Sequence, residues 1–586
     1  MPCYAVRRRR DQAWILQDYI VDVKSVKITF LFVTLGLLFL LAHSACIATG
    51  ADYNYQWPDA DPTDIPASDD DGDDDDDDGP VVAEDPAFCE LEANLDADGD
   101  GETTTACGGT DCDDSNADIN ASADEDGDGY ALCDITAENK AADCDDANPL
   151  IYADLPADSG WVRQCPIVEI DSLACGEEPH QNIQPTLLKI DDLYVVVYRS
   201  CFSNAVRSFG LATSTNLLTW TESAENPIWG PLQDGWDIGW TKVGSAGMSQ
   251  PWLFYDTVLD DYILYFHAQA NADNKRQIGC ATANDYGSFD DWGACDDGAP
   301  VVTKGAGGKW DDNTVQGPSV IYDDETETYH LFYSGCNIAG DVVWGMGWAT
   351  SNNGTVWTKQ TIDNPLMEDG AVGTWDESSA KFPAVLYDPV IEQYLAIYEG
   401  ADSDLMDAIG LASFDAPGDA WTKYAGNPIL EGYGGDHWER WDSYLGVNVG
   451  NLVMTDDNTF LMSYAGQYVP EDEEPEEDLS NVIINIGFAI NRRPAFQNLT
   501  PNTDIIVDSG TPLTIEGIIN DDKPQTVDVT IESNLDGLLA EPTPNNSGYF
   551  YLTTSTLSTG VHTITLTSLD SGGLRDRATI QITITE

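Results

Sequence analysis

The chain has 586 residues, and its 103 acidic against 25 basic residues give a formal net charge of -78. A field of that sign repels phosphate, which argues against nucleic acids and anionic membrane surfaces as partners. The length is too great for one hydrophobic core, and a hydrophobic content of 42% is enough to build several.

Residues 1–46 have the pattern of an export segment. Basic residues precede an apolar run at 28–41, and small residues then lead to Cys46. This arrangement resembles a lipoprotein cleavage box, in which Cys46 carries the lipid. The alternative is an uncleaved anchor, because residues 28–48 approach the roughly 20 residues of a membrane-spanning helix. Both interpretations predict an exported protein, either an outer-membrane or cell-surface lipoprotein or a secreted chain, with membrane contact only through its N-terminus.

Cysteine usage agrees with an oxidising compartment. Of 13 cysteines, Cys3 and Cys46 fall in the export segment, and most of the others are expected to pair. The local disulfide that we expect joins Cys280 to Cys295. The odd number of remaining cysteines leaves one unpaired, for which we predict Cys336.

Residues 47–85 and 86–158 are both acidic but differ in pattern. The first segment is an acidic linker, since charges of one sign at this density keep a chain disordered. The second contains two copies of an alternating aspartate motif with glycines. Its candidate metal ligands are Asp96, Asp98, Asp100, Asp111, Asp113, Asp124, Asp126, Asp128, Asp143 and Asp145.

Alternate aspartates place several oxygens around one point, which is how calcium loops are built. Neither copy is a true EF-hand, because Cys107 and Ile135 occupy the twelfth loop position. The segment resembles thrombospondin type 3 repeats. We therefore predict an irregular Asp/Cys-rich segment that binds calcium for stability. The alternative is a merely solvated acidic stretch.

One pattern occurs five times within residues 159–493. Each copy opens on a polar residue followed by a proline or glycine, and these positions are 66, 67, 65 and 67 residues apart. The five positions are Pro185, Pro251, Pro318, Pro383 and Gly450. A second strand with aromatic residues and a third with a glycine follow each opening. This period predicts an all-β fold in which four-stranded blades form a five-bladed β-propeller.

The fifth copy lacks its fourth strand. The segment that begins at Trp161 resembles the fourth strand that begins at Trp421. We therefore expect residues 161–170 to complete the last blade and close the ring, which removes two open sheet edges. Residues 494–586 continue with short alternating strands but without the period. They predict a C-terminal β-sandwich that resembles immunoglobulin-like modules, with spacing or adhesion as its role.

The period, the Pro318-Ser319-Val320 opening and the tyrosines of the second strands resemble the invertase, arabinanase and β-xylosidase superfamily of glycoside hydrolases over residues 161–494. The resemblance implies a site on the propeller axis, with an aspartate base or nucleophile in the first blade, a second aspartate that tunes the acid, and a glutamate acid in a later blade. Here the first-blade position is Gln184, and an amide cannot act as a base.

Catalytic carboxylates are therefore expected at neighbouring positions. The ends of the second strands carry residue types that do not recur, and among them Glu399 is the expected general acid. Asp311 or Glu377 is the expected base or nucleophile, each following a tryptophan in a loop that enters a blade. The repetition of this Trp-Asp pair also fits a structural latch.

The candidate substrate-binding residues surround the same axis. They are Gln184, Arg199, Gln250, His267, Gln316, Lys381 and Asp442. The competing interpretation is structural: Arg199 and His267 satisfy loop carbonyls, and Glu399 pairs with Lys381.

These patterns favour an exported, surface-anchored glycoside hydrolase-like propeller that acts on or binds oligosaccharide or polysaccharide. The chemistry requires no cofactor, and calcium is confined to the N-terminal repeats. This hypothesis predicts a deep axial pocket with two carboxylates ~5–10 Å apart. The alternative is a non-catalytic glycan-binding or adhesive surface protein, favoured by the missing aspartate. A phosphorylase is a further alternative, for which Arg199, Lys381 and Arg207 are the available anion-binding residues.

Overall fold

The computed structural model describes residues 161–586 with gaps, together with β1 (Ala142–Asp143) and β2 (Tyr152–Ala153), which pair antiparallel. The gaps are 168–182, 191–192, 202–206, 218–219, 231–247, 270–274, 288–290, 296–298, 338–343, 362, 404–406, 433–445, 456–457, 469–482 and 522. The export segment with Cys46, the acidic linker and nine of the ten candidate calcium ligands lie outside the described residues. The tenth, Asp143, is described only as part of β1.

The described residues are almost entirely β-structure, which confirms the predicted all-β class. Their one named helical element is the short 3-10 turn η6 (Pro524–Thr526). Within this part of the chain, no helix has the length and apolar character needed to cross a bilayer.

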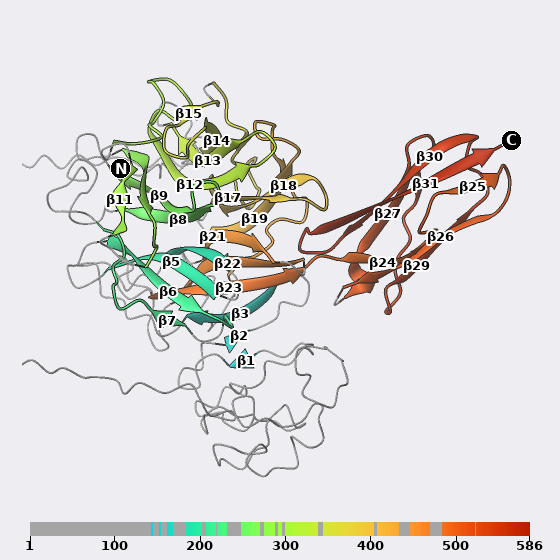
Figure 1. Ribbon diagram of the computed structural model, residues 1–586, viewed down its shortest axis with the longest axis horizontal. Coiled ribbons are helices and arrows are strands. Elements are labelled where there is room, and N and C mark those ends of the chain that lie inside the picture. Colours follow the sequence, from blue (N-terminus) through green and yellow to red (C-terminus); the bar gives the residue numbers. More distant parts are fainter. Residues whose placement is uncertain are drawn as a thin grey trace, which may run out of the picture. The chain divides into compact units, whose positions relative to one another are not determined.

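Five antiparallel sheets account for the five copies of the repeat (Figure 1). Sheet 1 contains β4 (Ile183–Ile190), β5 (Leu193–Cys201), β6 (Arg207–Ser214) and β7 (Thr221–Glu222). Sheet 2 contains β8 (Ser249–Asp256), β9 (Asp261–Gln269), β10 (Arg276–Ala283) and β11 (Gly293–Ala294). Sheet 3 contains β12 (Thr314–Asp323), β13 (Thr328–Cys336), β14 (Trp344–Ser351), β15 (Thr358–Lys359) and β16 (Met367–Glu368). Sheet 4 contains β17 (Ser379–Asp388), β18 (Gln393–Ala401), β19 (Asp407–Phe414) and β20 (Thr422–Lys423).

Sheet 5 takes its strands from both ends of the ring sequence. It contains β21 (Val447–Met454), β22 (Thr459–Tyr468), β23 (Ile483–Arg492) and then β3 (Val162–Ile167), which pairs antiparallel with β23. The prediction that the segment after Trp161 completes the last sheet is therefore confirmed. The first strands of the five sheets contact one another in a closed cycle, in the order β4, β8, β12, β17, β21 and back to β4.

The polar residue and proline that open each copy form a β-bulge. In four sheets, the residue before the proline has a positive φ: 58° at Gln184, 50° at Gln250, 61° at Gly317 and 58° at Phe382. The ladder to the second strand shifts register at each of these points. Proline fits there because it has no N–H to give to the ladder.

The recurrent tyrosine of the second strand is a core residue. It is 0% exposed in four sheets, at Tyr198, Tyr333, Tyr398 and Tyr464, and in sheet 2 the same position holds Phe266, which is also 0% exposed. Burial of five large aromatic side chains at one position of every sheet explains why the sequence repeats them.

Two further sheets follow the ring. One contains β24 (Ala495–Thr500), β26 (Leu513–Asn520) and β29 (Tyr549–Thr554). The other contains β25 (Ile505–Asp508), β31 (Arg575–Thr585), β30 (Gly560–Leu569), β27 (Asp528–Ser533) and β28 (Gly537–Ala540), and in it β25 runs parallel to β31. Both sheets enclose a single core that includes Ile515, Phe550 and Leu566.

The turn between β30 and β31 packs against the ring. Leu574 in this turn is fully buried and belongs to the hydrophobic core of the ring. The indole Nε1 of Trp161 donates to the carbonyl of Gly572 at 3.1 Å, and the Asn491 amide donates to Asp570 Oδ2 at 2.9 Å. The C-terminal sheets are therefore attached to the strand pair that closes the ring.

The cysteines bear out one prediction and contradict another. Cys280 and Cys295 form the expected disulfide, with their Cα atoms 5.4 Å apart. Cys336, predicted to be unpaired, is disulfide-bonded. It is fully buried beside Trp344, and sequence spacing gives no indication of which buried cysteine has a partner nearby.

Candidate functional site

The ends of the second strands lie level with the starts of the first strands. In the ladders, Arg199 pairs with Ile183, His267 with Ser249, Ser334 with Gln316, Glu399 with Lys381 and Ala465 with Asn448. Because the first strands form the inner cycle of the ring, these pairs occupy the same end of it. The structure thus brings together the variable residues that the sequence singles out.

Two carboxylates share one ammonium group in sheet 4. Lys381 Nζ is 2.9 Å from Glu399 Oε1 and 3.2 Å from Asp407 Oδ1. The second oxygen of Glu399 accepts from the backbone N–H of Val449 at 3.2 Å, and the Asn448 amide donates to Asp407 Oδ2 at 3.2 Å. Because both oxygens contact one ammonium group, the nearest oxygens of Glu399 and Asp407 are no more than about 6 Å apart, within the limit set by the wider carboxylate separations of glycoside hydrolases. We call Lys381, Glu399, Asp407 and Asn448 the acid cluster.

Burial dominates the electrostatics of Glu399. Its side chain is 2% exposed, and the pKa of its carboxyl is raised from 4.5 to about 7 by desolvation, against the lowering effect of Lys381 and with a further increase from Asp407. An upward shift of the pKa is the direction that a general acid requires. The side chain of Asp407 is more accessible, at 19%.

Asp407 was not among the residues expected from the sequence. It begins the third strand of sheet 4, opposite Ala401, and the corresponding third-strand residues of sheets 1, 2 and 3 are Arg207, Arg276 and Trp344. The position therefore varies from copy to copy, as Glu399 does. The same criterion of non-recurrence, applied to the third strands, would have identified it.

The remaining binding candidates contact neighbouring sheets. Arg199 donates to Ser249 Oγ at 2.9 Å, and the Gly317 N–H donates to His267 Nδ1 at 3.4 Å. Both side chains are buried, as is that of Gln316, whose side-chain Oε1 accepts from the Arg276 guanidinium. The Glu399–Lys381 pair of the competing interpretation is present, whereas these contacts of Arg199 and His267 involve a serine hydroxyl and a backbone N–H and not the loop carbonyls that it predicted.

The axis at the level of the bulges is nearly filled. The backbone N–H of Gln250 donates to Gln184 Oε1 at 3.0 Å, and the ring of Phe382 stacks on His267 with centroids 6.4 Å apart. At this level, the described residues leave a cavity of about 20 Å³, enough for one water molecule. The deep axial pocket expected from the sequence is not found at this level of the described residues, where Phe382 takes a position that is a glutamine in sheets 1 and 2, a glycine in sheet 3 and a valine in sheet 5.

Asp311 belongs to a latch. Its carboxylate is buried and accepts from Lys359 Nζ and, at 3.3 Å, from the Tyr333 hydroxyl. Asp376 of the next sheet does the same: it accepts from Lys423 Nζ at 2.5 Å, from the Tyr398 hydroxyl at 3.1 Å and from the Thr374 hydroxyl at 3.0 Å. We therefore assign Asp311 to this repeated latch and no longer to the base or nucleophile role.

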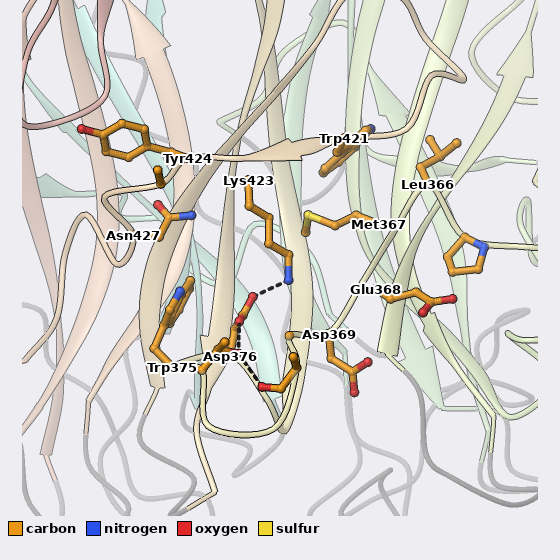
Figure 2. Close-up of a pocket in the computed structure, with 15 residues that line it drawn as sticks. Leu366, Met367, Glu368, Asp369, Trp375, Asp376, Trp421, Lys423, Tyr424 and Asn427 are labelled. Atoms are coloured by element: carbon orange, nitrogen blue, oxygen red, sulfur yellow. Dashed lines mark hydrogen bonds and ion pairs between the residues drawn. The ribbon is translucent and has the colours of Figure 1, made fainter.

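Figure 2 shows the latch of sheet 4 at the wall of a groove. The groove has a volume of about 940 Å³, and its lining includes Trp375, Trp421, Tyr424 and Glu368. In the figure, Lys423 reaches Asp376 from within this wall. Asp311 and Asp376 each accept from a lysine and from a second-strand tyrosine. The repeated Trp-Asp pairs of sheets 3 and 4 therefore stabilise their sheets.

Two further candidates are not brought into the acid cluster. Glu377 accepts a hydrogen bond from the backbone N–H of Gly373, within the turn that precedes β17. Asp442 lies outside the described residues. Among the described residues, no group of three or more His, Cys, Asp or Glu side chains has a geometry that could hold a metal ion.

No family model matches the sequence, and no curated protein matches it. Solved structures resemble about half of the chain. A thermostable family-43 glycoside hydrolase is 16% identical over 52% of this chain and 88% of that chain, with a TM-score of 0.39. The catalytic domain of a GH62 alpha-L-arabinofuranosidase from Coprinopsis cinerea is 14% identical over 57% and 98%, with a TM-score of 0.39. An N-acetylgalactosamine deacetylase from F. plautii is 13% identical over 56% and 95%, with a TM-score of 0.42. At these TM-scores, the likeness carries no inference about activity.

Proposed function

We propose that the five sheets form a five-bladed β-propeller that hydrolyses glycosidic bonds in oligosaccharides or polysaccharides. The observation that carries this proposal is the acid cluster, in which Glu399 and Asp407 accept from the same Lys381 ammonium group. Two carboxyl groups of unequal environment, one held protonated near neutral pH, are the requirement of glycoside hydrolysis.

The chemistry assigns a different role to each carboxyl group. Glu399 donates its proton to the leaving glycosidic oxygen as the bond from the anomeric carbon breaks. Asp407, the more accessible of the two, either attacks the anomeric carbon or removes a proton from an attacking water. Lys381 and Asn448 are positioning residues, because their hydrogen bonds fix the two carboxylates relative to each other.

A second candidate function is non-catalytic binding of glycans. Glutamines at the first-strand entries of sheets 1 and 2 favour this function. In sheet 1, the resemblance implied a catalytic aspartate at the position of Gln184. Amide groups donate and accept hydrogen bonds to sugar hydroxyls but cannot act as bases. The near closure of the axis by Phe382 favours the same alternative.

The wider organisation stays a proposal that rests on the sequence. It comprises an exported chain with a lipid on Cys46 or an N-terminal anchor, an acidic linker over 47–85, structural calcium bound within 86–158 and an immunoglobulin-like module over 494–586. In this arrangement, the linker holds a propeller that spans 159–493 away from the membrane, at the cell surface.

The test is hydrolysis of a panel of aryl glycosides and oligosaccharides by the full chain. A general acid matters when the leaving group is a poor one. Glu399→Gln should therefore lose activity by at least a hundredfold on phenyl or oligosaccharide leaving groups, but by less than tenfold on 2,4-dinitrophenyl glycosides. Asp407→Asn should lose both activities.

The latch variant Asp376→Asn is the matched control, since it changes a buried, lysine-paired carboxylate outside the acid cluster. Equal activity of Glu399→Gln and the unchanged chain on phenyl glycosides would contradict the proposal. No release across the panel, together with measurable binding of an oligosaccharide, would support the glycan-binding alternative.

A further inference from the structure

The sheet formed by β24, β26 and β29 presents two tyrosines on its outer face. Along β29, Tyr549 and Tyr551 are 38% and 59% exposed, and Phe550 between them is buried in the core. β29 is also the last strand of its sheet. Large aromatic side chains in such a position do not contribute to the core, and exposed aromatic clusters commonly mark binding sites.

The two rings form a rigid surface. Their centroids are 6.0 Å apart and their planes are inclined by 28°, so the two rings are stacked in a nearly parallel arrangement. The Tyr549 hydroxyl donates to Glu516 Oε2 at 2.6 Å, and Glu516 is the cross-strand partner of Tyr551. This bond fixes one ring beside the other, so little conformational freedom is lost when a ligand binds.

Hydroxyl and amide groups surround the rings. The Thr514 and Thr553 hydroxyls bond each other at 3.0 Å on the same face. On β24, Gln497 lies opposite Ile518 and Thr500 lies opposite Glu516. The face therefore combines two aromatic rings with short polar side chains, which are the groups that bind the apolar face and the hydroxyls of a sugar ring.

We propose that this face, the tyrosine platform of Tyr549, Tyr551 and Glu516, binds an uncharged polysaccharide by stacking its sugar rings on the two tyrosines. The charge of the chain selects the occupant: at a net charge of -78, an acidic polymer or a second copy of the chain is repelled. A protein partner with an apolar face fits less well, since most side chains around the rings are polar, with Ile518 opposite Tyr549 as the exception. The platform is independent of the acid cluster and does not require that the ring be catalytic.

The experiment measures retention of the full chain on insoluble polysaccharides. The Glu399→Gln background prevents hydrolysis, and the panel contains cellulose, xylan and chitin as neutral polymers and pectate as an acidic one. The expected result is saturable binding to at least one neutral polymer, weakened at least tenfold by Tyr551→Ala and by Tyr549→Ala. Tyr551→Trp should keep the binding, because it keeps an exposed aromatic face.

Ile506→Ala is the matched control, because Ile506 is 75% exposed on β25 of the other sheet. Tyr549→Phe keeps the ring but removes its bond to Glu516, and a loss of two- to fivefold is expected. A thermal unfolding curve for each variant separates lost binding from lost folding.

Three results would overturn the proposal. They are no retention on any neutral polymer, equal retention of the tyrosine-to-alanine variants and the control, and retention on pectate alone. Self-association that disappears in Tyr551→Ala would assign the platform to a second copy of the chain instead. Loss of hydrolysis in Glu399→Gln leaves this binding unchanged, so the two proposals fail separately.

Discussion

Glu399 owes its raised pKa to burial more than to any one neighbour. Its ordinary pKa of 4.5 rises to about 7 because desolvation and Asp407 outweigh Lys381. Between these values, the folded chain binds a proton that the unfolded chain has lost. The contribution of Glu399 to stability is therefore complete below pH 4.5 and is lost as the pH rises towards 7.

Activity gives the more specific measurement of this group, because burial also raises the pKa of Asp570 to about 7. If Glu399 is the general acid, kcat/KM on a phenyl glycoside should be constant below about pH 7 and should fall tenfold per pH unit above it. A pH–rate profile of the full chain measures this. A profile that stays flat to pH 9 would contradict the role of Glu399.

For the latches we expect the opposite result: a substitution should lower the free energy of unfolding and leave kcat unchanged. Asp376→Asn removes the charge that pairs with Lys423 and weakens the hydrogen bonds from Tyr398 and Thr374. Loss of one partner from a buried, hydrogen-bonded ion pair should reduce the free energy of unfolding by about 3 kcal/mol. Urea unfolding measures the loss, and kcat of the folded fraction should stay within twofold. A large fall in kcat at unchanged stability would instead assign Asp376 to the active site.

Individual site residues were predictable from the sequence where their residue type differs from that at the same position in the other copies of the repeat. Glu399 stood out as the one acid among the second-strand ends, and Lys381 as the one base among the strand entries. Asp407 and Asn448 were missed as partners because ladder register, which the sequence does not contain, determines which side chains meet across strands. The role of Asp311 was open for the same reason: a repeated Trp-Asp pair has one pattern whether it serves as a latch or as a catalytic group.

At the scale of the strand, the bulge at four of the five entries contains a residue with positive φ. Gly317 holds this position in sheet 3 with a φ of 61°, and a Cβ there would lie 2.8 Å from the Phe382 ring and 3.0 Å from its Cα. Gly317→Ala should therefore lower the free energy of unfolding by about 1–3 kcal/mol.

Gly307→Ala is the control for this variant, since nothing lies within 4 Å of a Cβ at that position. Both are measured by urea unfolding, and the control should change stability by less than about 0.5 kcal/mol. A Gly317→Ala chain as stable as the control would mean that the bulge relaxes without cost.

The strands themselves were the most predictable part of the molecule. The 65- to 67-residue period fixed five sheets, and the likeness of the Trp161 segment to the Trp421 segment identified β3, far from its partner β23 in the sequence. The filled axis was not predictable from the sequence. Phe382 occupies the same position in the repeat as Gln184 and Gln250, and only the packing of its side chain shows that the phenyl group lies at the axis.

At the scale of the whole molecule, one side chain from the C-terminal sheets packs in the core of the ring. Leu574 lies in the turn between β30 and β31 yet is fully buried in the core of the ring. Leu574→Ala should cost about 2–5 kcal/mol and should weaken the coupling between the two parts. Calorimetry should show one transition for the unchanged chain and two for the variant.

Leu557→Ala is the comparison variant, because Leu557 is buried in the core of the C-terminal sheets alone. It should lower stability without separating the transitions. Two transitions in the unchanged chain would show that the contacts of Trp161 and Asn491 with this turn do not couple the parts.

The closing strand also sets an order of events during synthesis. β3 is the first strand of the ring to be made, and its partner β23 comes about 300 residues later. At the usual 5–20 residues per second, this separation is roughly 15–60 s, during which sheets 1–4 are synthesised one after another and the ring cannot yet close. A nascent chain in this state is open to strand exchange with its neighbours, so a holdase that covers the N-terminal segment until translation ends should raise the yield of closed rings.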